Sequence, residues 1–244
     1  MKRGFLFCYY AYFHRAAVTF GLESANVVGY QTKDMVPGFN FLAPTFAPVD
    51  GTGNINLQDI KLDATTAESW SDNIQILDEG GATIATYGYA TAEESGFAKD
   101  GWLDEEGNYA ENVTVPYGAG ILIDSANDSV VTFSGQVSDT ASKIEGVSGF
   151  NFTGNNTPVE IDIQDIKLDA TKAESWSDNL QILDEGGATI ATYGFATAEE
   201  SGFEKDGWLD GDGNYAENVK IQPGQGVLID LANEGTIITI PAAL

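Results

Sequence analysis

The stretch IKLDATTAESWSDNIQILDEGGATIATYGYATAEESGFAKDGWLDEEGNYAEN at residues 60–112 recurs at residues 166–218 as IKLDATKAESWSDNLQILDEGGATIATYGFATAEESGFEKDGWLDGDGNYAEN. The two copies agree at 47 of 53 positions, and the period is 106 residues. Solenoid units are mostly about 20 to 50 residues long, so a unit of this length is expected to be one small domain copied whole. The sequence therefore predicts two similar domains in tandem.

Outside this block the copies diverge. The tail VTVPYGAGILIDSANDSVVTF of the first copy becomes VKIQPGQGVLIDLANEGTIITI in the second, so only the pattern of apolar and turn residues persists. Upstream, only the motif GFNF at 38–41 and 149–152 matches clearly. We expect a leader over residues 1–25, a first β domain over 26–137 and a second over 138–244.

Strand patterns dominate both copies. INLQDIKL, DNIQILD, ATIATYGYA, NVTVPYGAGILID and SVVTFSGQV alternate apolar with polar residues or are rich in Val, Ile, Thr and Tyr. The turn DEGG at 78–81 and 184–187 predicts a hairpin, and DATTAESWSD at 63–72 allows one short turn of helix with Asp63 as its cap. The predicted fold class is all-β, with two tandem homologous β-sandwich or small β-barrel domains.

A Pro-Gly-rich segment precedes the last strands of each copy, with Pro116 in the first and Pro223 in the second. Proline fixes φ and glycine permits positive φ, so we expect a tight turn that leads into a buried strand. The alternative, a phosphate-binding loop, lacks the Lys, the Ser or Thr and the following helix that such loops need.

The chain is strongly acidic. It has 37 Asp and Glu against 11 Lys and Arg, which gives a formal net charge of -26. This charge repels nucleic acid and anionic lipid surfaces, so we expect no nucleic-acid partner. It suits either a solvated surface that keeps a secreted protein soluble or the binding of cations.

The first 25 residues differ from the rest. A basic start at Met1, Lys2 and Arg3 is followed by the apolar run GFLFCYYAYF and by AAVTFG, where cleavage is expected. His14 and Arg15 interrupt the pattern, so the segment is a degenerate signal peptide, with a wrongly assigned start codon as the alternative. We expect an extracellular or cell-surface protein with no transmembrane segment in the mature chain.

The leader also holds the only Cys, Cys8, and the only His, His14. A mature chain without either residue excludes Cys-His and Ser-His-Asp catalysis, disulfides and nearly every zinc or copper site. A pair of carboxylates of the glycosidase type remains conceivable, but many acids do not make a placed pair. We expect a protein that is not an enzyme and has no catalytic residues or required cofactor.

Two acidic loops have oxygen ligands at alternate positions, as the first half of a calcium-binding EF-hand loop does. The match fails at the position of the loop's glycine, which is Tyr215, so a β-turn rich in Asp, Gly and Asn is the competing interpretation. Calcium is the best metal candidate because the chain offers hard oxygen donors. The candidate metal residues are Asp210, Asp212, Asn214 and Glu217 in the second copy and Asp104, Glu106, Asn108 and Glu111 in the first.

The four tryptophans form two equivalent pairs, Trp70 with Trp176 and Trp102 with Trp208. An exposed indole beside carboxylates and amides can cover the apolar face of a sugar while its neighbours bind the hydroxyls. Core packing also needs Trp, and one member of each repeat is expected to be buried. We expect Trp102 and Trp208, in the Gly-Trp-Leu-Asp turn, to be the better surface candidates for ligand binding.

Several further motifs stand out along the chain: ESANVVGY at 23–30, PGFNFLAPTF at 37–46, LQDIKL at 57–62, the Gly-Trp-Leu-Asp turn and the Pro-Gly-x-Gly strand entry. Together they resemble a group of exported, two-repeat β proteins of verrucomicrobial and related bacteria. The resemblance covers nearly the whole chain from Glu23 onward. It implies export and an all-β tandem organisation and transfers no functional residues, because that group has no established activity. The group usually has a normal signal peptide, and the leader of this chain departs from it.

The sequence predicts an exported structural or adhesive protein of the cell surface or extracellular matrix. Open edge strands can add subunits by strand pairing, and VVGY at 27–30 and TIITIPAAL at 236–244 are the candidate edges, so self-association or binding of matrix components is expected. The alternative is a bivalent carbohydrate-binding protein that uses the paired Trp positions to bind glycans. A third alternative is a β module that calcium stabilises.

Overall fold

The computed structural model describes residues 28–49, 51, 53–78, 81–184 and 186–243. Antiparallel strands make up nearly all of its regular structure, which confirms the predicted all-β class. No helix within these described ranges is long and apolar enough to cross a membrane. The predicted leader, with Cys8 and His14, lies outside the described residues.

The first repeat contains three sheets. A five-stranded sheet has the order β2-β9-β5-β6-β7, a three-stranded sheet has the order β1-β10-β4, and β3 pairs with β8. The elements are β1 (Val28–Met35), β2 (Gly38–Leu42), β3 (Asn54–Asn56), the 3₁₀ helix η1 (Leu57–Asp59), β4 (Lys61–Leu62), β5 (Asn73–Leu77), β6 (Thr83–Ala90), α1 (Ala92–Ser95), β7 (Gly101–Leu103), β8 (Thr114–Pro116), β9 (Ile121–Ser125) and β10 (Ser129–Gln136).

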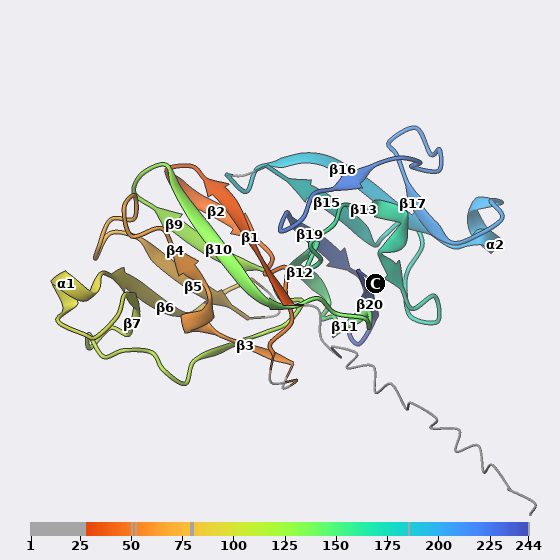
Figure 1. Cartoon of the computed structure of the whole chain (residues 1–244). Helices are drawn as coiled ribbons and strands as arrows, with labels where there is room; N and C mark the ends of the chain where they lie inside the picture. Colours follow the sequence, from red (N-terminus) through yellow and green to blue (C-terminus); the bar gives the residue numbers. More distant parts are fainter. Residues whose placement is uncertain (1–27, 50, 52, 79–80, 185, 244) are drawn as a thin grey trace, which may run out of the picture.

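The second repeat has the same strand orders, β12-β19-β15-β16-β17, β11-β20-β14 and β13-β18. The two halves lie side by side, with α1 and α2 at opposite ends of the molecule (Figure 1). The elements are β11 (Ser142–Glu145), β12 (Gly149–Gly154), β13 (Ile161–Asp162), η2 (Ile163–Asp165), β14 (Lys167–Leu168), β15 (Asn179–Leu183), β16 (Thr189–Ala196), α2 (Ala198–Ser201), β17 (Gly207–Leu209), β18 (Lys220–Ile221), β19 (Gly226–Leu231) and β20 (Ile237–Ile240). The domain limits at 26–137 and 138–244 stay a prediction.

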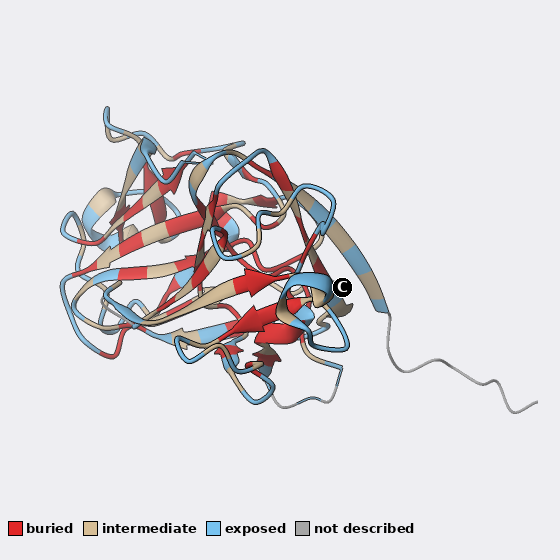
Figure 2. Ribbon diagram, turned by 90° about the vertical axis from the view of Figure 1, so that its left-hand side faces the viewer, coloured by how far each residue is buried: buried red, intermediate tan, exposed pale blue. Residues whose placement is uncertain are grey.

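Each repeat is sandwich-like because its five-stranded sheet is apolar on one face only. In β5, Ile74 and Ile76 are buried, whereas the alternate residues Asn73 and Gln75 point to the other face and are partly exposed. Ile74 and Ile76 belong to one apolar cluster with Leu62 of β4 and Val131 of β10. Buried residues accordingly line the space between the sheets, and exposed residues lie mainly in the loops (Figure 2).

Local signals shape the connections largely as the sequence indicates. β5 and β6 form the predicted hairpin, in which the Asp78 N–H donates to the Ala82 carbonyl at 2.8 Å. Residues 79–80 and 185 of the two turns lie outside the described residues. Asp63 caps its segment by accepting from the Thr65 N–H at 2.9 Å. The segment at 63–72 forms two single turns rather than a helix, and the short helix α1 begins after Thr91 instead.

The Pro-Gly-rich segments form the expected tight turns. The Ala119 N–H donates to the Pro116 carbonyl at 3.1 Å, and the Gln225 N–H donates to the Gln222 carbonyl at 3.0 Å. Each turn leads directly into a buried strand, β9 in the first repeat and β19 in the second.

Of the two predicted edge strands, one lies at a sheet edge and the other does not. β1 lies at the edge of its sheet, with β10 on one side only, as predicted for VVGY, of which Val27 lies outside the described residues. The expectation for TIITIPAAL is wrong, because β20 is the central strand between β11 and β14. A strand paired on both sides has no free edge to offer.

The two repeats contact each other through equivalent residues. Phe41 and Phe152, the last residues of the GFNF motif in each copy, have ring centroids 4.8 Å apart. The Ala43 N–H donates to the Gly224 carbonyl at 3.0 Å, and the Gly120 N–H donates to the Phe152 carbonyl at 3.0 Å. The ring contact joins equivalent residues, as contacts on the axis of a two-fold interface do, whereas the two backbone bonds are not reciprocal.

This contact predicts a glycine requirement at position 226. A Cβ added to Gly226 would lie 2.1 Å from Cδ1 of Phe41, so Gly226→Ala should lower the free energy of unfolding by about 1–3 kcal/mol through overpacking. Gly211, whose added Cβ would meet nothing within 4 Å, is the matched control, and Gly211→Ala should change stability by less than about 0.5 kcal/mol.

Urea unfolding followed by fluorescence measures both variants. Combining Gly226→Ala with Phe41→Ala should cost less than the sum of the single changes, because removal of the ring relieves the clash. Additive losses would contradict the proposed contact.

Candidate functional site

Trp102 and Trp208 are core residues, so the expectation that they are the surface pair is wrong. Both side chains are 0% exposed. The indole N–H of Trp102 donates to the Ile60 carbonyl at 2.8 Å, and its ring meets Tyr89 edge-on with centroids 5.6 Å apart. A side chain enclosed in this way cannot stack on a sugar.

A buried glutamine fixes the backbone of each core tryptophan. The Gln58 side chain donates to the Trp102 carbonyl at 2.7 Å and accepts from the Trp102 N–H at 3.1 Å. Gln164 makes the same pair of bonds to Trp208, at 2.7 and 3.0 Å. These bonds pair backbone groups that would otherwise be buried without a partner.

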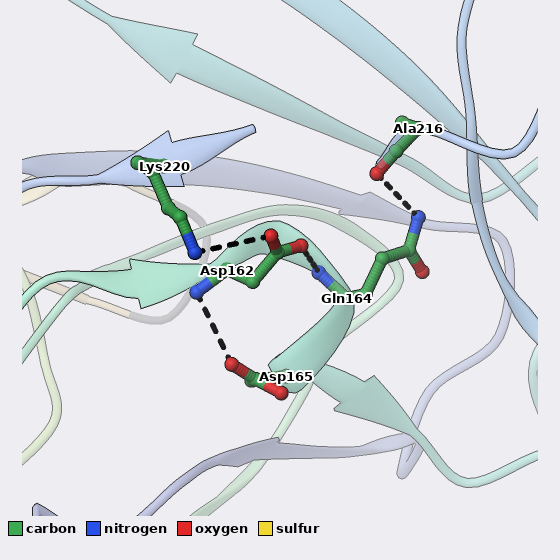
Figure 3. Close-up of polar contacts among 5 residues, drawn as sticks. All are labelled: Asp162, Gln164, Asp165, Ala216 and Lys220. Carbon is green, nitrogen blue, oxygen red and sulfur yellow. Dashed lines mark hydrogen bonds and ion pairs between the residues drawn. The ribbon is translucent and has the colours of Figure 1, made fainter. Parts of the chain in front are cut away.

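In the second repeat the entry to η2 anchors this glutamine (Figure 3). Asp162 accepts from the Gln164 N–H at 3.0 Å and forms an ion pair with Lys220 at 3.4 Å. Gln164 also donates to the Ala216 carbonyl at 3.0 Å, so it joins β17 to the turn that follows. These contacts give Asp162 and Lys220 a structural role at the entry to η2.

Trp70 and Trp176 are the exposed pair. Their side chains are 59% and 60% exposed, and their backbone φ angles are 67° and 69°. The left-handed region costs a non-glycine residue about 1–2 kcal/mol. Both repeats therefore hold a large apolar ring in solvent on a backbone that glycine would occupy more easily.

A buried carboxylate maintains this turn. Asp72 accepts from the Glu68 N–H at 2.8 Å and from the Ala126 N–H at 2.6 Å. The Trp70 N–H donates to the Tyr89 carbonyl at 2.8 Å, which ties the turn to β6. The surrounding hydrogen bonds thus impose the unfavourable φ on Trp70.

The second repeat repeats this arrangement. Asp178 accepts from the Glu174 N–H at 2.8 Å and the Ala232 N–H at 2.7 Å, and the Trp176 N–H donates to the Phe195 carbonyl at 2.8 Å. Burial raises the pKa of the Asp178 carboxyl above its ordinary value, because a charged group loses hydration there.

A polar sheet face extends beside each exposed tryptophan, and we call it the open face. In the first repeat Asn73 of β5 pairs with Asp124 of β9, and Gln75 pairs with Thr86 of β6. Residues directly opposite in antiparallel strands share a face, so these side chains lie together on the side away from the core. With Trp70, three of them line a hollow of about 530 Å³.

The open face of the second repeat has the same composition. The Asn179 amide donates to Asp230 at 3.4 Å, and the Gln181 amide donates to Asn179 at 3.2 Å. Amides and carboxylates that already bond to one another form an ordered polar surface. Such a surface beside an exposed indole provides hydrogen-bond partners at fixed positions.

The acidic loops use their first aspartate to close a turn. Asp210 accepts from the backbone N–H groups of Asp212 and Asn214, both at 2.9 Å, and Asp104 accepts from the Asn108 N–H at 2.7 Å. These bonds hold the pKa values of Asp104 and Asp210 below the ordinary value. Glu106, Glu111 and Glu217 are exposed.

Within the described ranges no group of three or more His, Cys, Asp or Glu residues could hold a metal ion. Calcium binding by the acidic loops stays a prediction.

Comparison of the chain with models of known protein families, with curated proteins and with solved structures finds no match. The geometry of the site therefore carries the functional argument by itself.

The strained turn predicts that the exposed tryptophan contributes little to stability. Trp176→Gly should change the free energy of unfolding by less than about 1 kcal/mol, because relief of the left-handed strain offsets the entropy that glycine adds to the unfolded chain. Trp208→Ala, in the core of the same repeat, should lose about 3–5 kcal/mol. Equal losses in the two variants, measured by urea unfolding, would show that Trp176 has a packing role.

Proposed function

We propose that this chain is an exported, non-enzymatic adhesive protein that binds carbohydrate through the open faces of its two repeats. The observation that carries the proposal is the exposed, left-handed tryptophan of each repeat, Trp70 and Trp176. Residues held in unfavourable backbone conformations cost stability and cluster at functional sites such as ligand clamps.

The chemistry around Trp70 suits a sugar. The indole supplies a flat apolar surface for the C–H face of a pyranose ring. Asn73, Gln75 and Thr86 border the same hollow, where the amide of Gln75 and the hydroxyl of Thr86 include both donors and acceptors for hydroxyl groups. A shallow polar surface with one aromatic platform fits a glycan better than a compact apolar ligand.

The charge of the open face selects among glycans. Asp104 and Glu105 border the hollow, and Asp124 lies on the face itself. Hydrogen bonds from Asn108 keep the pKa of Asp104 low, so this carboxylate is ionised at neutral pH. Together with the net charge of -26 this repels sulfated or uronic-acid polymers and favours uncharged ones.

Two similar faces on one chain favour adhesion over transport of a single sugar. A polymer or a cell surface offers many equivalent ligands, so one chain can engage it twice and gain apparent affinity without new contacts. This agrees with an extracellular location, which the signal-peptide-like leader predicts.

A glycan array with neutral and acidic polysaccharides tests the proposal. The wild-type protein should bind neutral members, and Trp70→Ala combined with Trp176→Ala should weaken binding at least about tenfold, the usual effect of losing a central aromatic contact. Phe97→Ala with Phe203→Ala is the matched control, because these aromatic residues are also equivalent and exposed but lie outside the hollow. Unchanged binding in the tryptophan variant, or binding of no glycan, would contradict the proposal.

Assembly through β1 is a second candidate function. The outer edge of this eight-residue strand pairs with no other strand of the described residues. A hollow of about 830 Å³ beside it is lined by apolar side chains that include Tyr30, Phe46 and Val49. An edge strand next to an apolar surface can accept a strand from a second copy of this chain.

Sedimentation velocity over a range of concentrations tests this candidate. Assembly through β1 predicts growing particles, and Tyr30→Lys with Thr32→Lys should keep the chain monomeric because charges on an edge strand oppose pairing. A monomer at every concentration would refute strand addition and leave carbohydrate binding unaffected. Stabilisation of the acidic loops by calcium remains a third candidate.

A further inference from the structure

Phe39 and Phe150 are exposed aromatic residues for which packing gives no reason. Phe39 lies in β2 and Phe150 in β12, with 49% and 45% of their side chains exposed. They are equivalent positions, each the second residue of a GFNF motif.

The other residues of this motif have structural tasks. Gly38 adopts a φ of 97°, which favours glycine, and Phe41 packs on Phe152 between the repeats. Asn40 accepts from the Val36 N–H at 2.9 Å and donates back to the Val36 carbonyl at 2.8 Å. Of the four motif residues, only the exposed phenylalanine, Phe39, has no such structural role.

The motif persists where its surroundings have changed. Between this motif and the near-identical block the two copies differ in length by five residues, and they match clearly again only just before the block, where Gln58 corresponds to Gln164. An exposed phenylalanine that is kept in both copies within such a segment points to use of its ring at the surface.

The strand register places Phe39 in line with the candidate site. Phe39 pairs with Asp124, Asp124 pairs with Asn73, and Asn73 pairs with Gly88. This row crosses the open face from β2 through β9 and β5 to β6, and Gly88 lines the hollow together with Trp70. The row therefore runs from Phe39 to Gly88, which lines the same hollow as Trp70.

The second repeat has the same row. Phe150 pairs with Asp230, Asp230 with Asn179, and Asn179 with Gly194 of β16. The two copies thus combine an edge-strand phenylalanine, a carboxylate, an amide and a glycine in the same order. The glycine leaves space above the sheet beside the tryptophan turn.

The length of the row indicates the size of the ligand. Neighbouring strands lie about 4.8 Å apart, so the three steps from β2 to β6 span about 14 Å. This exceeds a single pyranose ring and accommodates several linked rings. Polar groups between two aromatic ends fit a chain whose end rings stack while its middle hydroxyls form hydrogen bonds.

We propose that Phe39 and Phe150 form a second aromatic subsite in each repeat, and that the ligand is an uncharged, linear polysaccharide lying across the four strands from β2 to β6. In the second repeat it lies from β12 to β16. The inference rests on the proposed carbohydrate function and adds to it a chain-length requirement. A short glycan reaches only the tryptophan end, whereas a longer one also reaches the phenylalanine.

Isothermal titration of the full chain with disaccharides and hexasaccharides of cellulose, xylan, mannan and chitin tests this length requirement. At least one hexasaccharide should bind about tenfold or more tightly than its disaccharide. Phe39→Ala combined with Phe150→Ala should remove this gain and leave disaccharide binding unchanged. Phe39→Tyr combined with Phe150→Tyr, which keeps the stacking ring, should retain the gain.

The outcomes separate the two proposals. Equal affinity for both lengths, or a gain that survives Phe39→Ala with Phe150→Ala, overturns the second subsite while carbohydrate binding stands. No binding of any member overturns the carbohydrate function itself, and the subsite with it. Urea unfolding of each variant checks that it is folded, and the exposed positions should tolerate all four changes within about 1 kcal/mol.

Discussion

The enclosed indole of Trp102, repeated at Trp208, is the contact on which each half of the molecule depends. A small sandwich has little interior, and one large ring fills much of it, so the sheets must close around that ring. The ring can stay there because the amide of Gln58 binds both backbone groups of Trp102 and the Ile60 carbonyl accepts the indole N–H. Once this centre is closed on one face of the five-stranded sheet, the opposite face remains open to solvent.

The open face has features that stability alone does not explain. Burial explains why a core residue stabilises the fold. Trp70, in contrast, has a left-handed backbone and a ring that is largely in solvent. The carboxylate of Asp72 is buried beneath this turn and holds it through hydrogen bonds. Strain of this kind persists where it positions a group for binding. The sheet orders the amides and carboxylates on the neighbouring strands. A ligand would therefore bind a preorganised surface, and little side-chain entropy would be lost on binding.

Because the chain is duplicated, its two repeats can be compared with each other. The near-identical block cannot separate structural from functional residues, because everything in it is kept. The diverged flanks can separate them, because a residue that both copies keep there is expected to have a structural or functional role. Phe41 and Phe152 persist because they form the contact between the repeats. Phe39 and Phe150 persist on the surface, in register with the tryptophan turn, and binding is the role that their geometry supports.

The sequence by itself determined the all-β class, the hairpin and the turns, because these follow from period-two alternation and from the local preferences of Gly, Pro, Asp and Asn. It also singled out the tryptophans, but only the tertiary structure decided that Trp102 is enclosed and Trp70 exposed, since burial depends on strands distant in the chain. The central place of β20 has the same origin: its neighbours β11 and β14 lie far upstream, and no local pattern reveals which edge a later strand will cover. The row from Phe39 to the tryptophan turn likewise exists only through the register of four strands.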